Sequence, residues 1–415
     1  MKRIAIIGGG ISGLTVANLL RDQYEILVFE KESTPGGLIR CKTVNGSLFH
    51  ICGGHVFNSK RQDVLDWFWE KFDRSSEFIQ TDRNSVIDIE GTIIPYPLEN
   101  HIYLLDQNIQ KTIIREWLSL RFDAYAPANF EDFLKSRFGE TLYNLYFKPY
   151  NEKIWRCPLQ QVSLSWLEGK LPMPSVEEMF LNNLNQIKEK EFVHSTFWYE
   201  RKGGSQFIAD RLAKDIPIAY NTSIQHIERD NDSWIVDGQK FNMVIFCGNL
   251  KDLPATLSNM NLASYTTEID KLESHGTTSV FCEIEKNPYS WIYLPSSRHS
   301  SHRIICTGNF SPANNSLGKM TATIEFTDEM TIEEILDNLS RIPFNPTYLT
   351  HHYNQYTYPI QDLNTRKMIA GLKKKLSADS FYLTGRFADW EYYNMDVAIG
   401  AAMDTCKLIR NRDSL

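Results

Sequence analysis

The first thirty residues hold glycines and an acid at a spacing that suits the binding of a dinucleotide. Gly8, Gly10 and Gly13 follow a short apolar run and open a helical stretch. They permit a tight turn, close approach of a pyrophosphate to backbone, and close packing of helix on strand. The helix N-terminus, with Ser12 in its first turn, would face the phosphates. A second apolar run ends in Glu30, which would bind a ribose hydroxyl; an ordinary strand-helix turn is the alternative.

The segment after Glu30 indicates which dinucleotide cofactor to expect. Lys31 follows the acid, and the next turn contains Gly36, Gly37 and Leu38. The two glycines would let a second part of a ligand lie against backbone. The pattern Glu-Lys-x-x-x-x-Gly-Gly resembles the continuation seen in FAD-containing amine oxidases and their relatives, and enzymes that use only NAD seldom have it. We therefore expect FAD, with Lys31, Gly37 and Leu38 among its contacts.

The C-terminal end supplies a second half of the expected FAD site. A buried-type strand ends at Gly385, and an alanine-rich helical pattern runs from about Met395 to Ile409. A strand, a glycine and a helix in this order resemble the second FAD contact of the same superfamily, in which a helix N-terminus points at the flavin. The residues assigned to this contact are Gly385, Arg386, Asn394, Met395 and Asp396.

Two glycines precede a histidine in the middle of the N-terminal part. Gly53 and Gly54 would let the backbone pass close to a flat ring system, and His55 could hydrogen-bond to that ring. A glycine turn that carries a surface histidine is the alternative interpretation.

Aromatic rings alternate with lysines in two later segments. The side chains concerned are Tyr150, Asn151 and Trp155 in the first segment and Trp166 and Lys170 in the second. Such a mixture suits a ligand that has a base to stack on and phosphates to neutralise. Core aromatic residues beside solvated lysines explain the same pattern equally well.

Length and composition limit the classes of function. A chain of 415 residues is expected to form two or three domains. The formal charge is −7 with scattered Lys and Arg, so we expect no nucleic-acid partner but a small-molecule one, with a homo-oligomer left open. No apolar run approaches the ~18 residues of a membrane span. Seven cysteines without a Cys-x-x-Cys pair indicate reduced thiols of a cytoplasmic protein, and ten histidines without metal-ligand spacing predict no metal site.

The alternation of patterns predicts an α/β fold with a Rossmann-type FAD-binding parallel sheet, a helical insertion domain and an antiparallel β-sheet domain. Helical spacing prevails from His101 to Lys190, where Asn129 is expected to cap a helix with Asp132 as the reciprocal acid. Strands are expected in between, among them one long stretch from Ile218 to Ile227. The predicted division is 1–80, 200–274 and 351–415 for the FAD domain, 100–190 for the helical substrate-side domain, and 81–99, 191–199 and 275–350 for the antiparallel sheet.

Seven segments, in order over the whole chain, resemble the UDP-galactopyranose mutase family, and several resemble its eukaryotic branch. They are Gly53-Gly-His-Val-Phe57, Pro95-Tyr-Pro97 with Asn100, Pro149-Tyr-Asn-x-Lys-x-Trp155, Trp291-x-Tyr-x-Pro295, His302-Arg303 with Phe310-Ser-Pro312, Tyr358-Pro-Ile360, and Gly385-Arg-x-x-x-Trp-x-Tyr-x-x-Met-Asp396.

The resemblance implies an isomerase that exchanges the pyranose and furanose forms of UDP-galactose or a related nucleotide sugar, as in cell-surface polysaccharide synthesis. In that family reduced FAD is the nucleophile: N5 attacks the anomeric carbon, UDP leaves, the sugar ring opens, and it closes through another hydroxyl to give galactofuranose. No net redox change occurs, and NAD(P)H is one candidate for the initial reductant. The protein then supplies orientation and electrostatics.

The resemblance also assigns residues. His55 and Arg303 are the expected catalytic residues, with His55 beside the flavin and Arg303 on the diphosphate. Tyr358 is expected to donate its hydroxyl to the same phosphates. The full set of expected substrate contacts is Tyr96, Asn100, Tyr150, Asn151, Trp155, Trp166, Lys170, Tyr293, Arg303, Tyr358 and Tyr392.

Two departures from the family pattern bear on the substrate. Lys170 stands where the eukaryotic members carry a second diphosphate-binding arginine, and a lysine cannot bind two oxygens through a planar fork. Leu98 and Glu99 replace an aromatic residue and the glutamine that reads the uracil. An ionised Glu99 accepts hydrogen bonds but cannot donate them. The nucleotide and the sugar therefore stay open, with an N-acetylated or deoxy hexose among the alternatives.

Two other functions remain as alternatives. A flavin oxidoreductase of the amine oxidase or protoporphyrinogen oxidase type would share both FAD segments, although it has little use for the diphosphate-binding residues Arg303 and Tyr358. A non-catalytic flavoprotein that binds a nucleotide sugar would explain the loss of the second arginine.

Overall fold

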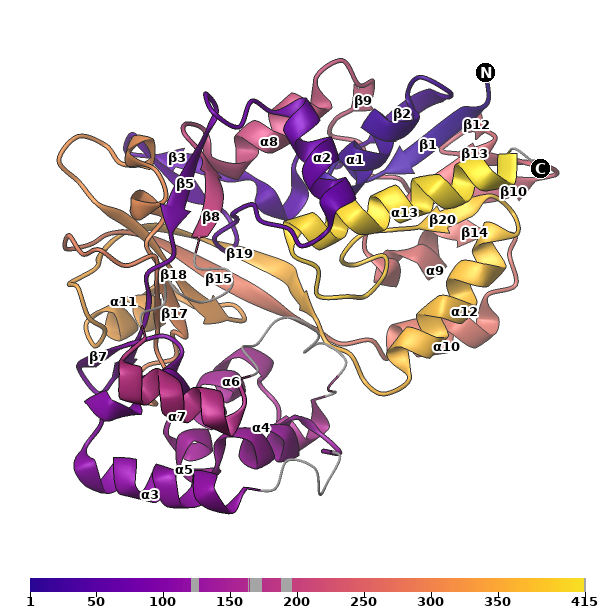
Figure 1. Cartoon of the computed structure of the whole chain (residues 1–415). Helices are drawn as coiled ribbons and strands as arrows, with labels where there is room; N and C mark the ends of the chain where they lie inside the picture. Colours follow the sequence, from indigo (N-terminus) through magenta and orange to yellow (C-terminus); the bar gives the residue numbers. More distant parts are fainter. Residues whose placement is uncertain (121–126, 163, 165–173, 188–195, 414–415) are drawn as a thin grey trace.

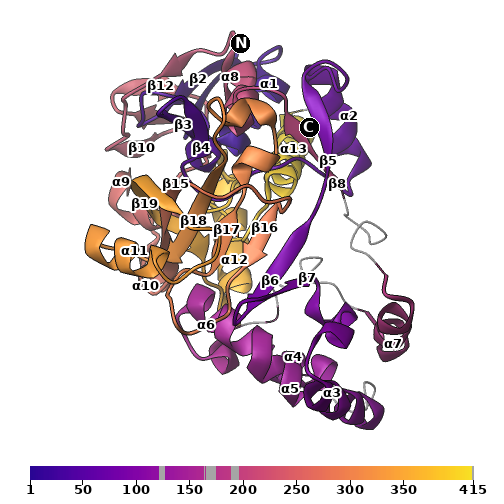
Figure 2. The ribbon, with the colours of Figure 1, turned by 90° about the vertical axis from the view of Figure 1, so that its left-hand side faces the viewer.

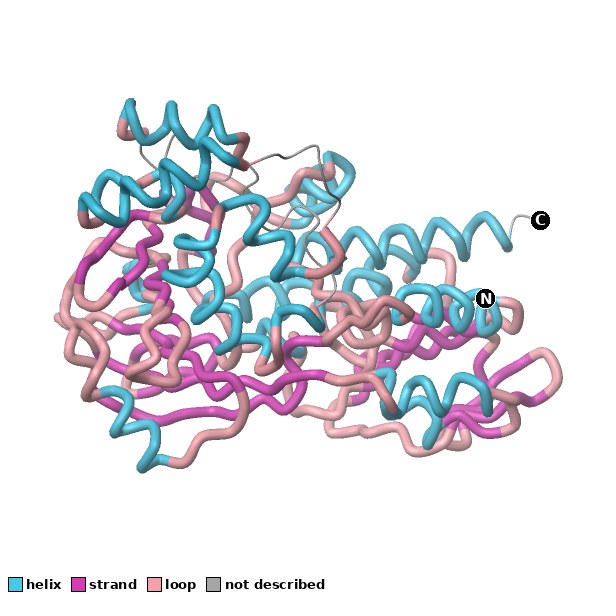
Figure 3. Tube along the Cα trace, turned by 90° about the horizontal axis from the view of Figure 1, so that it is seen from below, coloured by secondary structure: helices cyan, strands magenta, loops and turns pink. Residues whose placement is uncertain are grey.

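The computed structural model describes residues 1–120, 127–162, 164, 174–187 and 196–413 of the chain. A parallel sheet and a larger mixed sheet lie side by side, and helices form a separate layer below the mixed sheet (Figure 1). Seen from below, these helices gather at one end of the molecule and both termini lie at the other (Figure 3). The predicted α/β class and its parallel sheet are confirmed.

The parallel sheet forms the dinucleotide-binding part. Its five strands lie in the order β20 (Phe381–Leu383), β13 (Met243–Phe246), β1 (Arg3–Ile7), β2 (Glu25–Phe29) and β9 (Ile218–Ala219). Central strands of such a sheet are apolar on both faces because both faces are covered. One face packs on α1 (Ile11–Leu20) and α13 (Met395–Asp413), while the other packs on α12 (Thr365–Ser377) and a smaller sheet.

The smaller sheet and several helices complete this part. The four strands are β12 (Gln239–Phe241), β11 (Ser233–Val236), β10 (Ile227–Asp230) and β14 (Leu257–Ser258), in that order. The accompanying helices are α2 (Gln62–Lys71), α8 (Gly204–Ala213), α9 (Leu253–Thr256) and α10 (Ala263–Asp270). The single strand expected from Ile218 to Ile227 is wrong, because its two ends belong to different sheets: β9 pairs with β2 and β10 pairs with β11.

The larger sheet has seven strands and carries Arg303 and Glu325, which are discussed below. Their order is β19 (Thr347–Pro359), β15 (Ser274–Glu283), β18 (Thr321–Thr327), β17 (Arg303–Ile305), β16 (Trp291–Tyr293), β6 (Ser85–Ile89) and β7 (Thr92–Pro95). The sheet is antiparallel except that β16 and β6 pair in parallel, so it is mixed rather than purely antiparallel. The helix α11 (Ile332–Leu339) packs on it through Ile335 and Leu339.

The longest strand, β19, was not foreseen. It pairs with β15 from Thr347 to Pro359, so the predicted boundary at residue 350 falls inside it. Its alternating polar and aromatic residues gave no apolar run to mark a strand. The division into three domains stays a prediction.

Two further ribbons connect the parts. The strands β3 (Cys41–Val44) and β4 (Ser47–His50) pair with each other, as do β5 (Phe78–Asp82) and β8 (Thr196–Glu200). The second ribbon lies beneath α2 and leads down to β6 and β7 (Figure 2). The sequence also predicts a strand from Phe192 to Glu200; β8 forms its part from Thr196 on, and residues 192–195 lie outside the described residues.

The helical insertion packs around one aromatic core. It contains α3 (Gln107–Ser119), α4 (Phe130–Phe138), α5 (Glu140–Leu142), α6 (Lys148–Trp155) and α7 (Val176–Asn185). The side chain of Asn129 accepts a hydrogen bond from the N–H of Asp132 at 2.9 Å, which confirms the predicted cap. The reciprocal contact differs from the capping box, because Asp132 accepts from the Asn129 amide side chain rather than from its backbone.

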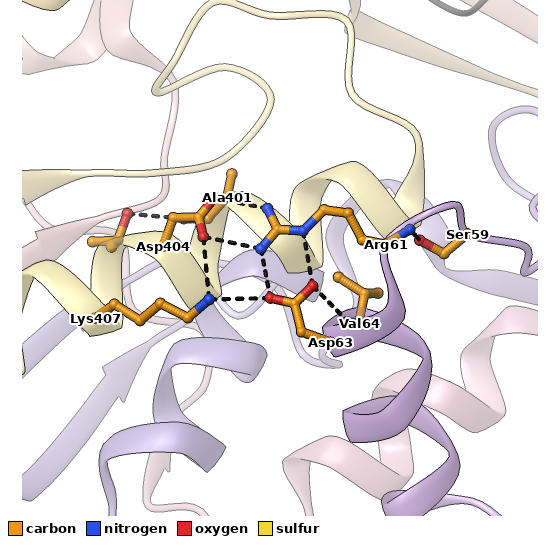
Figure 4. Close-up of polar contacts among 8 residues, drawn as sticks. Ser59, Arg61, Asp63, Val64, Ala401, Asp404 and Lys407 are labelled. Atoms are coloured by element: carbon orange, nitrogen blue, oxygen red, sulfur yellow. Dashed lines mark hydrogen bonds and ion pairs between the residues drawn. The ribbon is translucent and has the colours of Figure 1, made fainter.

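A network of ion pairs connects α2 with α13. The Arg61 guanidinium contacts Asp404 on α13 and Asp63 on α2, and Lys407 also contacts Asp63 at 3.1 Å (Figure 4). A Cβ at Gly400 would lie 2.8 Å from the Arg61 guanidinium, so a glycine is needed where the side chain crosses the helix. Single exposed pairs of this kind stabilise little, but the shared arginine fixes the position of α13.

The two ends of the chain meet at the edge of the same part of the molecule (Figure 1). Lys2 donates to Asp413 at 3.0 Å, and the Tyr24 hydroxyl donates to the same carboxylate at 2.8 Å. None of the helices in the described part of the chain is long and apolar enough to cross a membrane.

Glu200, the last residue of β8, is fully buried. Among the described residues neither of its carboxyl oxygens has a hydrogen-bond partner. Burial raises the pKa of this carboxyl to about 8 from an ordinary value of 4.5. An unfolded chain would ionise Glu200 at the ordinary value, so the folded state loses stability as pH rises from about 4.5 to about 8.

The substitution Glu200→Gln keeps the shape of the side chain and removes its ionisation. We expect a gain in the free energy of unfolding on the order of 1–3 kcal/mol at pH 8 and almost none at pH 5. Thermal unfolding at both pH values checks this, with the exposed Glu228→Gln as the matched control. Equal unfolding midpoints for Glu200→Gln and wild type at pH 8 would show that ionisation of the Glu200 carboxyl does not destabilise the folded state.

Candidate functional site

The glycine turn after β1 has the geometry of a dinucleotide cradle. Gly8 has φ = +107°, and its N–H donates to the Phe29 carbonyl on β2 at 2.8 Å. A Cβ at Gly13 would lie 2.0 Å from the Gly8 carbonyl oxygen, so only glycine allows α1 to pack this close to the turn. Gly10 precedes the first residue of α1, whose N-terminal amides are thus open to an anion.

The acid at the end of β2 is held in place by backbone donors. Glu30 is 5% exposed and accepts hydrogen bonds from the N–H groups of Gly9 at 2.7 Å and Glu32 at 2.9 Å. Its carboxylate therefore lies directly against the glycine turn, where a ribose would pass. Lys31, by contrast, is exposed.

The second glycine turn closes over the first. Gly36 donates its N–H to the Gly9 carbonyl at 2.8 Å, and a Cβ at Gly37 would lie 3.3 Å from the Cα of Gly10. The two turns therefore form one backbone surface, as expected from their glycine content. The neighbouring Leu38 contributes its carbonyl to His55, as described below.

The C-terminal contact lies on the same surface. Gly385 has φ = +120°, and a Cβ there would lie 3.2 Å from the Ser12 hydroxyl on α1. The Gly385 N–H donates to Asp389, whose carboxylate Lys373 also contacts at 2.5 Å. The helix α13 begins with the buried Met395 and the acid Asp396. The Asn394 carbonyl, just before it, accepts the first hydrogen bond of the helix, from the Ala398 N–H. Segments from both ends of the sequence thus meet here.

His55 lies between the segment of Leu38 and the Gly53-Gly54 turn. Its Nε2 lies 3.0 Å from the Leu38 carbonyl oxygen, and because a carbonyl only accepts, Nε2 carries the proton. Burial, together with the nearby charge of Arg386, lowers the pKa of His55 to about 4. The imidazole is therefore neutral at physiological pH.

Three side chains form a row across the larger sheet. Tyr293 on β16 lies opposite Arg303 on β17, and Arg303 lies opposite Glu325 on β18. Alternate residues of neighbouring strands point to the same face, so the register brings a ring, a guanidinium and a carboxylate together.

Glu325 joins the arginine to the Gly53-Gly54 turn. One carboxylate oxygen pairs with Nε of Arg303, and the other accepts the N–H of Gly53 at 2.9 Å. Burial alone would raise the pKa of Glu325, but the Arg303 guanidinium, with the His302 ring 3.5 Å away, holds it at about 2. This fully buried carboxylate is thus charged, and it fixes the guanidinium relative to the Gly53-Gly54 turn.

The arginine also contacts a pair of stacked tyrosines. Nη2 of Arg303 donates to the Tyr358 hydroxyl at 2.7 Å. The rings of Tyr358 and Tyr392 stack with centroids 5.3 Å apart and planes 9° apart, and the Arg386 guanidinium lies 4.9 Å from the Tyr392 ring. No described residue accepts from Nη1 of Arg303, so part of its fork remains for an anion.

An aromatic group lies on the other side of the same row. The Tyr293 ring is 5.2 Å from Tyr96 and 5.4 Å, edge to face, from Tyr150 on α6. Tyr96 precedes Pro97 through a cis peptide bond. The Arg83 guanidinium donates to the Tyr293 hydroxyl at 2.9 Å and lies over the Tyr96 ring at 5.7 Å. The row thus has rings on one side and the Gly53-Gly54 turn on the other.

Other expected substrate residues make contacts within the helical insertion. Asn100 is buried and accepts from Asn182 of α7, Asn151 donates to a carbonyl one turn back in its own helix, and Trp155 is 5% exposed within the aromatic core. The surroundings of Trp155 are therefore those of a core aromatic residue, the alternative to a ligand contact. Trp166 and Lys170 lie outside the described residues.

The sequence assigned no role to Glu325, Arg83 or Lys153. Glu325 is the one acid in Thr321-Ala-Thr-Ile-Glu-Phe-Thr327, and a lone charge in such a buried-type strand was a usable signal. Lys153 stands in the family-like segment that ends at Trp155, but its partners, like that of Arg83, come from distant segments. Among the described residues no group of three His, Cys, Asp or Glu side chains is arranged to hold a metal.

The arrangement can bind an elongated anion beside a flat cofactor. The glycine turns and the start of α13 make a surface for a dinucleotide, while Arg303 and Tyr358 provide donors for phosphate oxygens. The neutral imidazole of His55 lies beside Leu38 and the Gly53 turn. Such a site orients a ligand and stabilises negative charge on it.

Comparisons with known proteins agree with the geometry. Residues 6–72 match the family model of the NAD(P)-binding Rossmann-like domain. The chain is therefore an α/β protein with a Rossmann-like dinucleotide-binding domain. UDP-galactopyranose mutase of Mycoplasma genitalium is 22% identical over 409 residues, which cover 95% of this chain and 92% of that protein. The chain is thus similar to this mutase along nearly its whole length.

Solved structures share the fold. The crystal structure of reduced UDP-galactopyranose mutase matches with a TM-score of 0.88 at 21% identity, covering 99% of this chain and 94% of that one. A provisionally named protoporphyrinogen oxidase from Exiguobacterium matches with a TM-score of 0.77 at 14% identity, covering 99% of both chains. Mutase and oxidase thus share one architecture, and only the site can distinguish them.

The pair Arg303–Glu325 predicts an asymmetric response to substitution. Arg303→Met leaves a buried carboxylate without its cation, which should lower the free energy of unfolding by about 3–5 kcal/mol. Adding Glu325→Gln removes that charge and should recover most of the loss. Urea unfolding of the single and double variants measures both effects.

The matched control is Lys319→Met, which breaks the partly exposed pair with Glu283 on the same sheet. It should cost less than about 1 kcal/mol. A double variant no more stable than Arg303→Met would show that the stranded charge is not the source of the loss.

Proposed function

We propose that the protein is a flavin-dependent nucleotide-sugar mutase that interconverts pyranose and furanose forms of UDP-galactose or a related nucleotide hexose. The observation that carries the proposal is Arg303, which Glu325 fixes beside the Gly53 turn while part of its fork stays open. A cation in this place suits a diphosphate held next to a dinucleotide cofactor.

The residues present fit FAD. The two glycine turns leave no room for side chains at Gly13 and little at Gly37, and Glu30 is buried against the first turn. The turn at Gly385 and the start of α13 come next to Ser12 on the same surface. Once bound and reduced, FAD would supply a nucleophilic nitrogen for the anomeric carbon of the sugar.

The protein's own residues would act on the diphosphate. Arg303 and Tyr358 would donate to its oxygens in the substrate and again as negative charge grows on the leaving UDP. Tyr150 and Tyr293 would give the nucleotide an aromatic surface. His55, neutral and hydrogen-bonded to the Leu38 carbonyl, would present a fixed, uncharged ring to the cofactor.

The oxidoreductase alternative explains the cofactor surface equally well, since the fold is shared. It leaves Arg303 unexplained, because an amine or porphyrinogen substrate offers no diphosphate to a guanidinium already paired with a buried acid. A nucleotide-sugar-binding flavoprotein without activity would use the same contacts, so turnover must separate it from a mutase.

The direct test uses purified protein whose flavin absorbance is recorded first. Dithionite-reduced protein is incubated with UDP- and dTDP-hexopyranoses and hexofuranoses, and the products are separated by anion-exchange chromatography. We expect isomerisation only in the reduced state, with UDP-galactose first and a modified UDP- or dTDP-hexose second. Stoichiometric oxygen uptake with an amine or porphyrinogen would favour the oxidase, and binding without turnover in both redox states would favour the non-catalytic protein.

Glu99 predicts a pH dependence of nucleotide binding. This residue stands where the resembled family has a uracil-reading glutamine; it is 2% exposed, and burial raises its pKa to about 7. Below that value the protonated carboxyl can both donate and accept, as an amide does, but above it only accepts. UDP affinity should therefore fall as pH rises from 6 to 8.5.

The variant Glu99→Gln should bind UDP almost equally at both pH values and about two- to tenfold more tightly than wild type at pH 8.5, the worth of one hydrogen bond. Calorimetry measures the affinities, and the exposed Glu177→Gln is the control. A pH slope that persists in Glu99→Gln would place the titrating group elsewhere.

A further inference from the structure

Lys153 on α6 makes an unusual set of contacts. Its Nζ donates to three backbone carbonyls, those of Leu294 at 2.7 Å, Ser296 at 2.6 Å and Ser301 at 3.0 Å. An ammonium has three N–H donors, so each is satisfied by a carbonyl. The same nitrogen lies 3.5 Å from Nδ1 of His299.

The charge of this lysine has no acid beside it. Among the described residues no carboxylate lies within ion-pair distance of Lys153, and burial lowers its pKa to about 7. Placing an ammonium here costs free energy that a neutral side chain would not cost. This free-energy cost indicates that Lys153 has a structural role, which depends on the segments that it connects.

The three carbonyls all belong to the loop between β16 and β17. That hairpin begins at Tyr293 and resumes at Arg303, which face each other, and the Leu294 N–H donates to the His302 carbonyl at 2.9 Å to close it. Lys153 therefore fixes the loop whose two ends are the ring and the guanidinium of the candidate site.

The same helix contributes to the site directly. Tyr150 lies three residues before Lys153, so both side chains project from one face of α6. Tyr150 contacts the Tyr293 ring edge to face, and α6 ends with the Trp155 carbonyl accepting from His275 on β15 at 2.6 Å. The helical insertion is thus joined to the sheet at three points along one helix.

We propose that Lys153 is a positioning residue for Arg303: by holding the 294–302 loop through three carbonyls, it sets the guanidinium at the distance from Tyr150 that a diphosphate requires. The inference rests on the proposed function for the identity of the anion. Lys153 itself does not touch the ligand, since its donors are all occupied.

A double-mutant cycle on anion binding tests this role. Arg303→Lys keeps a cation beside Glu325 but loses the planar fork. Lys153→Met should weaken binding of UDP and of inorganic pyrophosphate about tenfold in the wild-type background and less than twofold in Arg303→Lys. The affinities are measured by calorimetry at pH 6, where Lys153 carries its charge. A contribution independent of Arg303 would instead give the same factor in both backgrounds.

The matched control is Lys148→Met, which removes a charge from the exposed face of the same helix. It should leave the affinities unchanged, whereas an equal loss would mean that charge alone matters. Flavin content and thermal midpoints verify folding, and Lys153→Gln, which keeps two donors, takes the place of Lys153→Met should that variant not fold.

The outcomes separate the two proposals. Equal factors in both backgrounds overturn the role of Lys153 while leaving the mutase proposal intact. Unchanged pyrophosphate affinity in Arg303→Lys overturns the phosphate site itself. Coupling between the two positions in a protein without mutase activity would support the role of Lys153 and count against the mutase.

Discussion

A single buried carboxylate connects the parts of this molecule that must act together. Glu325 pairs with Arg303 on the next strand and accepts the N–H of Gly53 from the N-terminal part. Without its cation the acid would be an uncompensated charge in the protein interior, and without the acid the guanidinium would be free to turn. The positions of the Arg303 guanidinium and of the Gly53-Gly54 turn therefore depend on one side chain.

The surroundings of this pair follow from the same constraint. The sheet register places Tyr293, Arg303 and Glu325 in one row, so the ring side and the cofactor side of the site are set by strand pairing rather than by flexible loops. Lys153 adds a restraint from the helical insertion, where backbone carbonyls take the role that an acid has for Arg303. The charge of Arg303 is thus balanced by a carboxylate, and the charge of Lys153 by the dipoles of backbone carbonyls.

Much of the cofactor side could be read from the sequence because its determinants are local. Gly8, Gly13 and Glu30 lie within one strand-turn-helix-strand unit, and each has a steric or hydrogen-bonding reason that holds in any chain. The partners of Arg303 could not be derived in this way, since Glu325 and Tyr358 reach it through the pairing of distant strands. The strand β19 was not predicted for a related reason. Its polar and aromatic residues form a strand because they pair with β15 across the sheet, and they show no apolar pattern along the sequence.

The dinucleotide surface is shared between the two ends of the chain, and this has a consequence for biosynthesis. The first strand of the sheet lies between β13 and β2, but β20 and α13, which supply the Gly385 turn and the Met395 end, are made more than 350 residues later. At about 5–20 residues per second, the N-terminal glycine turn exists for roughly 20–80 s before its C-terminal counterpart leaves the ribosome. The cofactor can therefore be enclosed only after the segment from Phe381 to Asp413 has been made, and a product truncated before it lacks half of the surface that would hold it.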